Sequence, residues 1–293
     1  MKSVYLLIIS WTTIAIVIAL GGMRYFNLSL LDVYKYRTAA SGNLPSIFSY
    51  ILPVISKVIL PFSLLISIHY KKKILSWLAI IGSVMVFGLT SNKGPLVYPL
   101  IILAMYFVLG RKNPIKWLII GYILTLILSH ISFLTEGLEM IGSMIIRRGY
   151  LIPAEINYLY FDFFSSPENN FYYWSDSRIT AGLLERPYDL RGANLIGLEY
   201  FGGENTSANT GWIGTGFMQA GYIGMALYAI ILSFIFAIIN SYSISIGLRL
   251  IVPLLTISIL TVTTSSDLLT SLLTHGLIYC LILMSLIKPD SPK

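Results

Sequence analysis

Residues 115–134 read IKWLIIGYILTLILSHISFL, an apolar stretch with one lysine near its start and no acidic residue. A helix needs about 20 predominantly apolar residues to cross roughly 30 Å of hydrocarbon. Outward from this stretch, the chain has further apolar runs at roughly 4–22, 47–69, 74–90, 95–109, 211–239, 248–264 and 268–287. Together these runs predict an all-α, polytopic membrane protein with about eight transmembrane helices.

The composition agrees with a membrane protein, because 56% of the 293 residues are hydrophobic and only 11% are charged. Soluble chains contain about 25% charged residues. The net charge of +7 lies in short tracts between apolar runs, whereas nucleic-acid binders carry theirs on a solvated face. Cys280 has no partner for a disulfide, and His69, His130 and His275 are too scattered for a zinc site. We therefore expect no nucleic-acid partner, no metal and no nucleotide cofactor.

The first run follows Lys2 and ends in Ala19-Leu20-Gly21, a pattern that also fits a signal peptide. We interpret it as an uncleaved membrane anchor, because it is long for the apolar part of a signal peptide. The runs 74–90 and 95–109 are short, and with the turn 91–95 they fit either two thin spans or a re-entrant pair.

Basic residues in the short turns predict the orientation, since they favour the cytoplasmic side of a membrane. With the N-terminus in the cytoplasm, the inner turns hold Lys2, Lys71, Lys72, Lys73, Arg111, Lys112, Lys116, Arg249, Lys288 and Lys293. The short outer connections hold only Arg24, Lys35, Arg37 and Lys93. Both termini are therefore expected in the cytoplasm, with spans 1–5 in residues 1–134, one long extracytoplasmic loop in 135–210, and spans 6–8 in 211–293.

Two features inside the spans stand out. Lys57 lies between Pro53 and Pro61, which predict a kink or a broken helix, and a lysine within a span usually faces a partner or a water-filled cavity. The sixth run opens with several glycines, which we interpret as sites of close helix packing rather than clearance for a substrate. These are Gly211, Gly214, Gly216, Gly221 and Gly224.

The long outer loop combines arginines with many aromatic residues. Apolar residues at three- and four-residue steps predict a helix over 147–164, and the glycine-rich segment 187–210 is expected to be irregular coil. Arginine is suited to phosphate and aromatic faces offer a platform for sugar rings, so the pair suggests a phosphate-bearing saccharide. The alternative is an ordinary aromatic belt with surface ion pairs.

From about residue 24 to its end the chain resembles the bacterial oligosaccharide repeat unit polymerases, the O-antigen polymerase family. The resembling stretches are FNLSL (26–30) with Val33, Tyr34 and Arg37, SNKGP (91–95), RRGYLIP (147–153), YLYFDFF (158–164), ANTGWIG (208–214), AGYIG (220–224) and LLTHG (272–276). Their order around one long outer loop makes the likeness moderately specific. The chain departs from the family in having about three fewer spans at its N-terminal end, as a compact variant or a truncated reading frame would.

The resemblance implies a glycosyltransferase-C-like fold in the bacterial cytoplasmic membrane. Such enzymes move a growing glycan from its undecaprenyl pyrophosphate carrier onto a newly flipped, lipid-linked repeat unit, which builds O-antigen or capsular polysaccharide. The implied partners are that lipid-linked oligosaccharide and the bilayer, with a chain-length regulator and a flippase as further candidates. No metal or cofactor is implied. The alternatives are an O-antigen ligase, or a lipid-linked oligosaccharide flippase or exporter.

The resemblance also implies roles for individual residues. Cations would meet the charge of the leaving diphosphate, and a carboxylate or imidazole would accept the proton of the attacking hydroxyl. The diphosphate candidates are Arg147, Arg148, Arg178, Lys93 and Arg191; the candidate bases are Asp162 and Glu155, with His275 as the alternative; the sugar contacts are Asn209, Tyr160 and Trp174.

Each of these residues also has a plain structural interpretation. Arg147 and Arg148 can mark the membrane border, Asp162 can pair with an arginine, and Asn209 can cap the sixth span. His275 can simply be a packed, hydrogen-bonded residue of its span.

Overall fold

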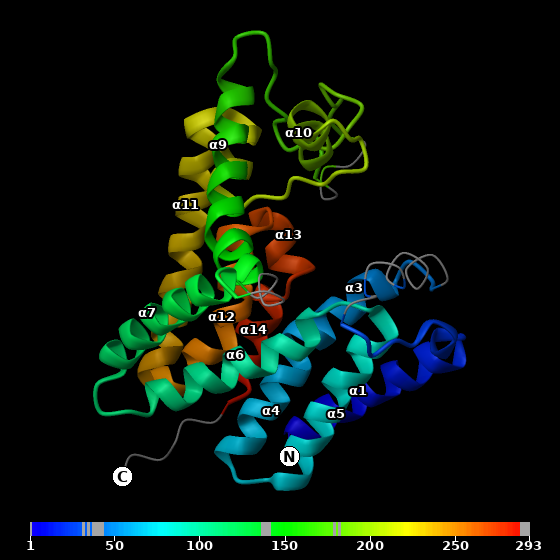
Figure 1. The fold of residues 1–293 in the computed structure, drawn as a ribbon, viewed down its shortest axis with the longest axis vertical. Helices are drawn as coiled ribbons and strands as arrows, with labels where there is room; N and C mark the ends of the chain where they lie inside the picture. The colour runs from blue at the N-terminus through cyan, green and yellow to red at the C-terminus, as the bar shows by residue number, and fades with distance from the viewer. Residues whose placement is uncertain are drawn as a thin grey trace. The chain divides into compact units, whose positions relative to one another are not determined.

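The computed structural model describes residues 2–30, 33, 36, 44–135, 142–177, 180 and 183–287 (Figure 1). This part of the chain consists of helices and turns, without a strand. The α-helices are α1 (Lys2–Ala19), α3 (Phe48–Val54), α4 (Leu60–His69), α5 (Lys73–Thr90), α6 (Gly94–Leu109), α7 (Pro114–Phe133), α9 (Ile152–Ser165), α10 (Gly192–Phe201), α11 (Trp212–Ile246), α12 (Leu248–Thr264), α13 (Leu268–Leu273) and α14 (Leu277–Ser285). A 3-10 turn (η1, Gly22–Tyr25) and two π-helical segments (η2, Ile55–Ile59; η3, Ser143–Leu151) complete the set.

Five helical stretches are long and apolar enough to cross a membrane: Phe48–His69, Lys73–Thr90, Pro114–Phe133, Trp212–Ile246 and Leu268–Ser285. Three shorter apolar helices, Ser3–Ala19, Gly94–Leu109 and Leu248–Thr264, occupy the other predicted runs. In the described residues, the all-helical fold, with several helices long and apolar enough to cross a membrane, is therefore confirmed. The count of eight spans stays a prediction.

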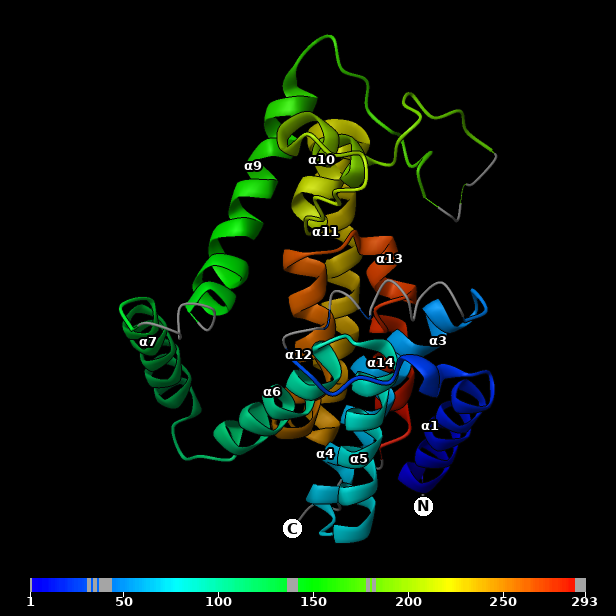
Figure 2. The ribbon, with the colours of Figure 1, turned by 45° about the vertical axis from the view of Figure 1, so that its right-hand side comes forward.

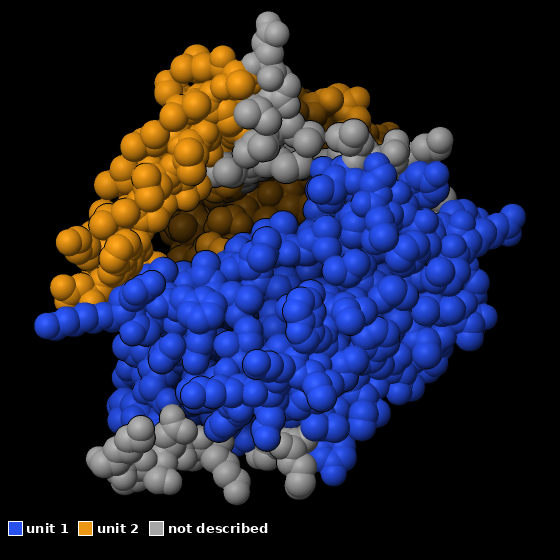
Figure 3. Space-filling model, turned by 60° about the horizontal axis from the view of Figure 1, so that its bottom comes forward, with its two compact units in different colours: residues 1–112, 239–258, 272–293 blue, residues 113–238, 259–271 orange. Residues whose placement is uncertain are grey.

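The chain divides into two compact units (Figure 3). Unit 1 comprises residues 1–112, 239–258 and 272–293, and unit 2 comprises residues 113–238 and 259–271. The predicted outer loop, 135–210, thus belongs to the same unit as α7 and most of α11.

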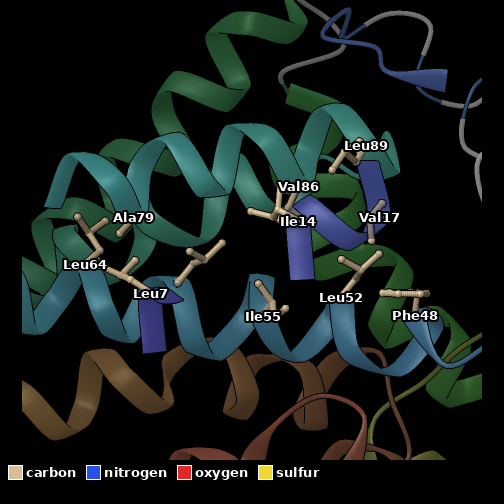
Figure 4. Close-up of a cluster of buried hydrophobic side chains, with 11 residues drawn as sticks. Leu7, Ile14, Val17, Phe48, Leu52, Ile55, Leu64, Ala79, Val86 and Leu89 are labelled. Carbon is tan, nitrogen blue, oxygen red and sulfur yellow. The ribbon is translucent and has the colours of Figure 1, made fainter. Parts of the chain in front are cut away.

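In unit 1, α1, α4 and α5 lie side by side (Figures 1 and 2). Their shared core contains Leu7 and Ile14 of α1 and Ala79 and Val86 of α5 (Figure 4). Each pair is seven residues apart, so both members lie on one face of their helix. A Cβ on Gly82 would come within 2.9 Å of a Leu60 methyl. The missing side chain lets α5 approach α4 closely, as small residues do between membrane helices.

The second predicted span is continuous but irregular. It runs from α3 through the π-helical segment η2 into α4, with Pro53 inside α3 and Pro61 in the first turn of α4. Proline lacks a backbone N–H and disturbs the regular ladder, and a π-helical turn is one way in which a helix absorbs such a disturbance. The irregular turn contains Lys57.

The last predicted span is broken. Helix α13 ends at Leu273 and α14 begins at Leu277, with Gly276 between them at φ +86°. A Cβ on Gly276 would lie 2.2 Å from a Val58 methyl in η2. Both the left-handed backbone and this close approach require glycine. The two irregular turns of unit 1, around Lys57 and His275, are therefore neighbours.

In unit 2, aromatic residues of the predicted outer loop form a core. Ile156, Tyr160, Phe163 and Phe164 of α9 are buried together with Tyr172; Ile196, Ala208, Phe217 and Met218 complete the cluster. The predicted helix over 147–164 is present as α9, preceded by η3. Most of these rings stabilise the loop itself.

The expectation of irregular coil over 187–210 is wrong for residues 192–201, which form α10. Its glycines serve close packing: a Cβ on Gly197 would meet the Thr206 carbonyl oxygen at 1.9 Å. Glycine usually indicates a turn in a sequence. Here it permits α10 to lie directly against the backbone of the segment that follows the helix.

Helix α11 bends sharply at Ala220 and Gly221, whose φ/ψ angles are −159°/37° and 59°/−140°. A Cβ on Gly224 would lie 2.1 Å from the Gly216 carbonyl, although residues eight apart in a straight helix are separated by about 12 Å. A Cβ on Gly211 would similarly meet the Thr263 carbonyl at 2.1 Å. These contacts agree with the close-packing interpretation of the glycines.

Candidate functional site

Lys57 and His275 form a polar pair in unit 1. Lys57 Nζ lies 2.6 Å from His275 Nδ1, although the two residues are 218 positions apart in the chain. Lys57 projects from η2, and His275 sits in the break between α13 and α14. The Ser258 hydroxyl donates to the His275 carbonyl at 3.1 Å, which satisfies an oxygen that a continuous helix would have paired.

The pair lines a cavity of about 450 Å³ in unit 1. Its walls come from the start of α3, the end of α5, the start of α6 and the turn before α14. Polar lining residues include Ser56, Thr90, Asn92, Tyr98 and Thr274. Ligand pockets of roughly 300 to 1,000 Å³ are typically apolar with a few convergent polar groups, and this cavity has that character.

The chemistry of the pair depends on which atom carries the shared proton. Two positive charges 2.6 Å apart repel strongly in a desolvated site, so the pair holds at most one. In the uncharged pair, His275 Nδ1–H donates to the Lys57 amine, and His275 Nε2 is then a free proton acceptor. The arrangement can therefore take up one proton and become a single cation.

Lys93 belongs to the same unit and lies in the turn beside the cavity. The Asn92 side-chain oxygen accepts from the Gly94 N–H at 3.1 Å, and Ser91 adopts a left-handed φ of +47°. Lys93 directly precedes α6 and is half-buried. It follows Asn92, which lines the cavity, so its backbone lies next to the cavity wall.

The two predicted carboxylate bases lie in unit 2, on the exposed side of α9. Glu155 occupies its first turn, and Asp162 accepts a hydrogen bond of 2.6 Å from the Tyr200 hydroxyl. Burial, together with this bond to Asp162, raises the pKa of Tyr200. Asp162 is thus partnered by a tyrosine.

The predicted arginines are placed differently from one another. Arg147 is exposed on η3, and Arg191 is exposed just before α10, where its carbonyl accepts from the backbone of Asn194 and Leu195. The side chain of Arg148 and all of Arg178 lie outside the described residues.

The three predicted sugar contacts have different surroundings. Tyr160 is 1% exposed and donates to the Ala208 carbonyl at 3.1 Å, so its ring face is closed to a sugar by the outer-loop core. Asn209 is exposed, and α11 begins three residues later at Trp212, so Asn209 does not cap that helix. Trp174 is half-buried and donates from its indole N–H to Tyr228 at 3.1 Å.

Trp174 belongs to a polar network in unit 2 that the sequence did not indicate. Its backbone N–H donates to the Gln219 side chain at 2.6 Å, and Gln219 donates to Asp176 at 3.0 Å. The Tyr228 hydroxyl donates to Asp267 at 2.7 Å. Burial raises the pKa of Asp267, more than its hydrogen bonds lower it. The network joins the predicted outer loop to α11 on both sides of its bend, at Gln219 and at Tyr228.

The backbone strengthens this connection at the bend of α11. The N–H groups of Tyr172 and Tyr173 donate to the carbonyls of Met218 and Gln219, at 3.1 and 2.9 Å. These carbonyls directly precede the bend at Ala220 and Gly221, where a regular helix would have used them. Irregular backbone of this kind is tolerated at membrane depth when other protein groups satisfy it.

A scan against protein-family models and searches of curated proteins and of solved structures find no match to this chain. The resemblance to the oligosaccharide repeat unit polymerases therefore stays a prediction. The chemistry of the site rests on the Lys57–His275 pair and its cavity.

Proposed function

We propose that the protein is a glycosyltransferase of the bacterial cytoplasmic membrane that polymerises undecaprenyl-pyrophosphate-linked repeat units at the outer face. The observation that carries the proposal is the 2.6 Å contact of Lys57 Nζ with His275 Nδ1 in a cavity of about 450 Å³. A proton acceptor and a latent cation within one cavity can serve the attacking hydroxyl and the leaving diphosphate of glycosyl transfer.

The orientation of the spans supports this placement. With the N-terminus in the cytoplasm, α3–α4 runs inward and α5 runs outward, so the basic turn Lys71–Lys73 is cytoplasmic. The cavity involves the opposite ends of these helices, so in this orientation we propose that it faces the outer side. That is the face at which flipped, lipid-linked repeat units would be presented.

In the proposed reaction, an acceptor-sugar hydroxyl attacks C1 of the sugar that is joined to the carrier diphosphate. The new C1–O bond forms as the bond from C1 to the phosphate oxygen breaks, and its electron pair leaves with undecaprenyl diphosphate. The hydroxyl proton passes to His275 Nε2 while Lys57 is uncharged, because the pair holds at most one positive charge. The Lys57–His275 pair then carries one positive charge, which stabilises the departing diphosphate electrostatically.

Other residues of the earlier prediction take secondary places in this proposal. Lys93 adjoins the cavity and is proposed to contact the diphosphate. Arg147 and Arg191 are exposed and are proposed to contact the charged or polar parts of the glycan, and Trp174 and Asn209 stay candidate sugar contacts. Tyr160 is removed from the sugar contacts because it is buried. Asp162 and Glu155 remain alternative bases.

The experiment that tests the proposal is incubation of the purified protein with lipid-linked repeat units, without nucleotide or metal, followed by gel separation of the glycans. A ladder spaced by one repeat unit supports polymerisation. Transfer of a single glycan block to a different lipid acceptor would favour a ligase instead. Movement of the lipid-linked substrate across vesicles without longer glycans would favour a flippase or exporter and reject the enzyme proposal.

A further inference from the structure

A second cavity lies at the other end of unit 1, away from the ends of α3 and α5 that form the first. Its volume is about 990 Å³, and its walls come from the start of α1, the end of α4, the start of α5 and the residues after α14. The wall is largely apolar, with Val4, Phe62, Ile66, Leu75, Leu286 and Ile287. An apolar cavity of this size at helix ends is suited to an acyl chain.

Basic residues stand at one side of this cavity. Lys72 lines it, and its sequence neighbours Lys71 and Lys73 are exposed in the same turn. The turn is fixed by its backbone, because the Lys72 N–H donates to the Ser67 carbonyl at 2.7 Å. Lys71 adopts a left-handed φ of +55°, a conformation usually given to glycine. A lysine at this position adds charge where the turn geometry alone would favour glycine.

The cavity also contains a polar group that lacks a partner. Ser67 lines it and is 1% exposed, and its hydroxyl has no hydrogen-bond partner among the residues that the structure describes. A buried hydroxyl is normally hydrogen-bonded. Because Ser67 lines the cavity, a ligand oxygen in the cavity is a suitable acceptor for its hydroxyl. An apolar wall, one buried donor and an adjacent cation match the acyl chain, ester carbonyl and phosphate of a glycerophospholipid.

From these observations we infer that the cavity binds one anionic phospholipid of the adjacent leaflet. Its acyl chain occupies the apolar volume, an ester carbonyl accepts from Ser67, and its phosphate contacts Lys72. Basic pockets between membrane helices are a known kind of site for anionic headgroups. The inference concerns membrane attachment of unit 1 and is independent of the proposed glycosyl transfer.

The test is native mass spectrometry of the purified full chain in a mixture of phosphatidylglycerol and phosphatidylcholine. The wild type is expected to retain one phosphatidylglycerol in preference to phosphatidylcholine. Lys72→Gln should reduce that preference about five-fold, the amount expected for one lysine near an anionic headgroup. Ile66→Trp should narrow the cavity and weaken retention of both lipids.

Two matched variants control for charge and for added bulk. Lys116→Gln removes an exposed lysine at the start of α7, and Ile282→Trp adds the same ring at a half-exposed position of α14; both should retain lipid as the wild type does. Equal retention of the two lipids by the wild type would overturn the inference, as would a loss in Lys116→Gln equal to that in Lys72→Gln. Competition by glycerol phosphate alone would indicate a phosphate site without an acyl-chain cavity, and retention of a polyprenyl lipid would assign the cavity to another ligand.

Discussion

At the scale of single residues, the position of a side chain separates the candidate bases. His275 is half-buried, lines a cavity and contacts Lys57, whereas Asp162 is exposed and accepts from Tyr200. A general base has to reach the proton that it accepts, and its environment has to favour the transfer. The cavity meets the first condition at His275, because its side chain lines the space that a substrate would occupy.

Asp162→Asn and Glu155→Gln should therefore retain polymerisation. Both side chains are exposed, so each change should alter the free energy of unfolding by less than about 0.5 kcal/mol. The measurement is the rate of ladder formation together with the thermal unfolding midpoint in detergent. Loss of the ladder in either folded variant would assign the base to α9 and contradict the role given to His275.

Asp267 should show a pH-dependent contribution to stability. Burial raises its pKa above the ordinary value of 3.8, so the charged carboxylate is less stable in the fold than in the unfolded chain. The stabilisation that is present at pH values below the unfolded pKa is then lost as the pH rises through the folded pKa. The asparagine of Asp267→Asn does not titrate, so the variant does not lose this stability as the pH rises.

We therefore expect the difference in unfolding midpoint, Asp267→Asn minus wild type, to depend on pH. This difference should rise from about pH 4 upward and level off above the folded pKa of Asp267. The altered hydrogen bonds to Tyr228 and to the first turn of α13 shift both ends of this curve equally. A difference that falls as the pH rises, or one independent of pH, would contradict the raised pKa.

At the scale of elements, the irregular turns position the proposed site. Lys57 and His275 meet because η2 bulges and because α13 and α14 separate at Gly276, whose Cα faces Val58. Broken membrane helices commonly carry the binding sites of membrane proteins. In this chain, the breaks carry the charged and titratable side chains into the cavity.

Gly276→Ala should destabilise unit 1 and separate Lys57 from His275. A left-handed φ costs alanine about 1 to 2 kcal/mol, and overpacking against Val58 adds about 1 to 3 kcal/mol. Gly247→Ala is the matched control, because Gly247 also has a positive φ, +96°, but nothing lies within 4 Å of a Cβ there. The measurement is the unfolding midpoint of each variant.

The steric part of this effect can be isolated with a second substitution. Val58→Ala removes the methyl that the new Cβ would meet, so Gly276→Ala combined with Val58→Ala should recover part of the loss. If Gly276→Ala and Gly247→Ala lower the midpoint equally and Val58→Ala rescues nothing, the close approach of the two turns is incorrect.

At the scale of the whole molecule, the fold class follows from hydropathy alone. The apolar runs coincide with helices because burial of apolar side chains in lipid and pairing of backbone groups within a helix act over the same 20 or so residues. The helix breaks and the partners across them were harder to predict. Pro53 and Pro61 indicated a disturbance near Lys57, but nothing in the sequence paired Lys57 with a histidine 218 residues away.

Glycine caused both a correct and an incorrect prediction at this scale. In α11 the glycines pack as expected, whereas in 192–201 they indicated coil although the segment is helical. Composition cannot distinguish a glycine that turns the chain from one that faces another backbone, because that depends on which segment lies opposite. The burial of Tyr160 in the outer-loop core depends on tertiary contacts in the same way.

Cysteine labelling should establish the orientation of the spans. Cys280 is buried, so Cys280→Ser with one new cysteine gives a defined probe. Asn170→Cys in the outer loop should react with an impermeant maleimide in intact cells, and Lys112→Cys only after permeabilisation. The opposite pattern would place the Lys57–His275 cavity at the cytoplasmic face and contradict the proposed function.

The Lys57–His275 pair is proposed to perform glycosyl transfer. The most direct measurement is the rate of ladder formation from lipid-linked repeat units by His275→Gln and Lys57→Met, with His130→Gln and Lys116→Met as matched controls on α7. Loss of a general base typically costs about 10²- to 10⁴-fold, so His275→Gln should fall by at least about 100-fold while both controls keep the wild-type rate. Folded His275→Gln and Lys57→Met proteins that still form the ladder at the wild-type rate would show that the pair does not perform the transfer.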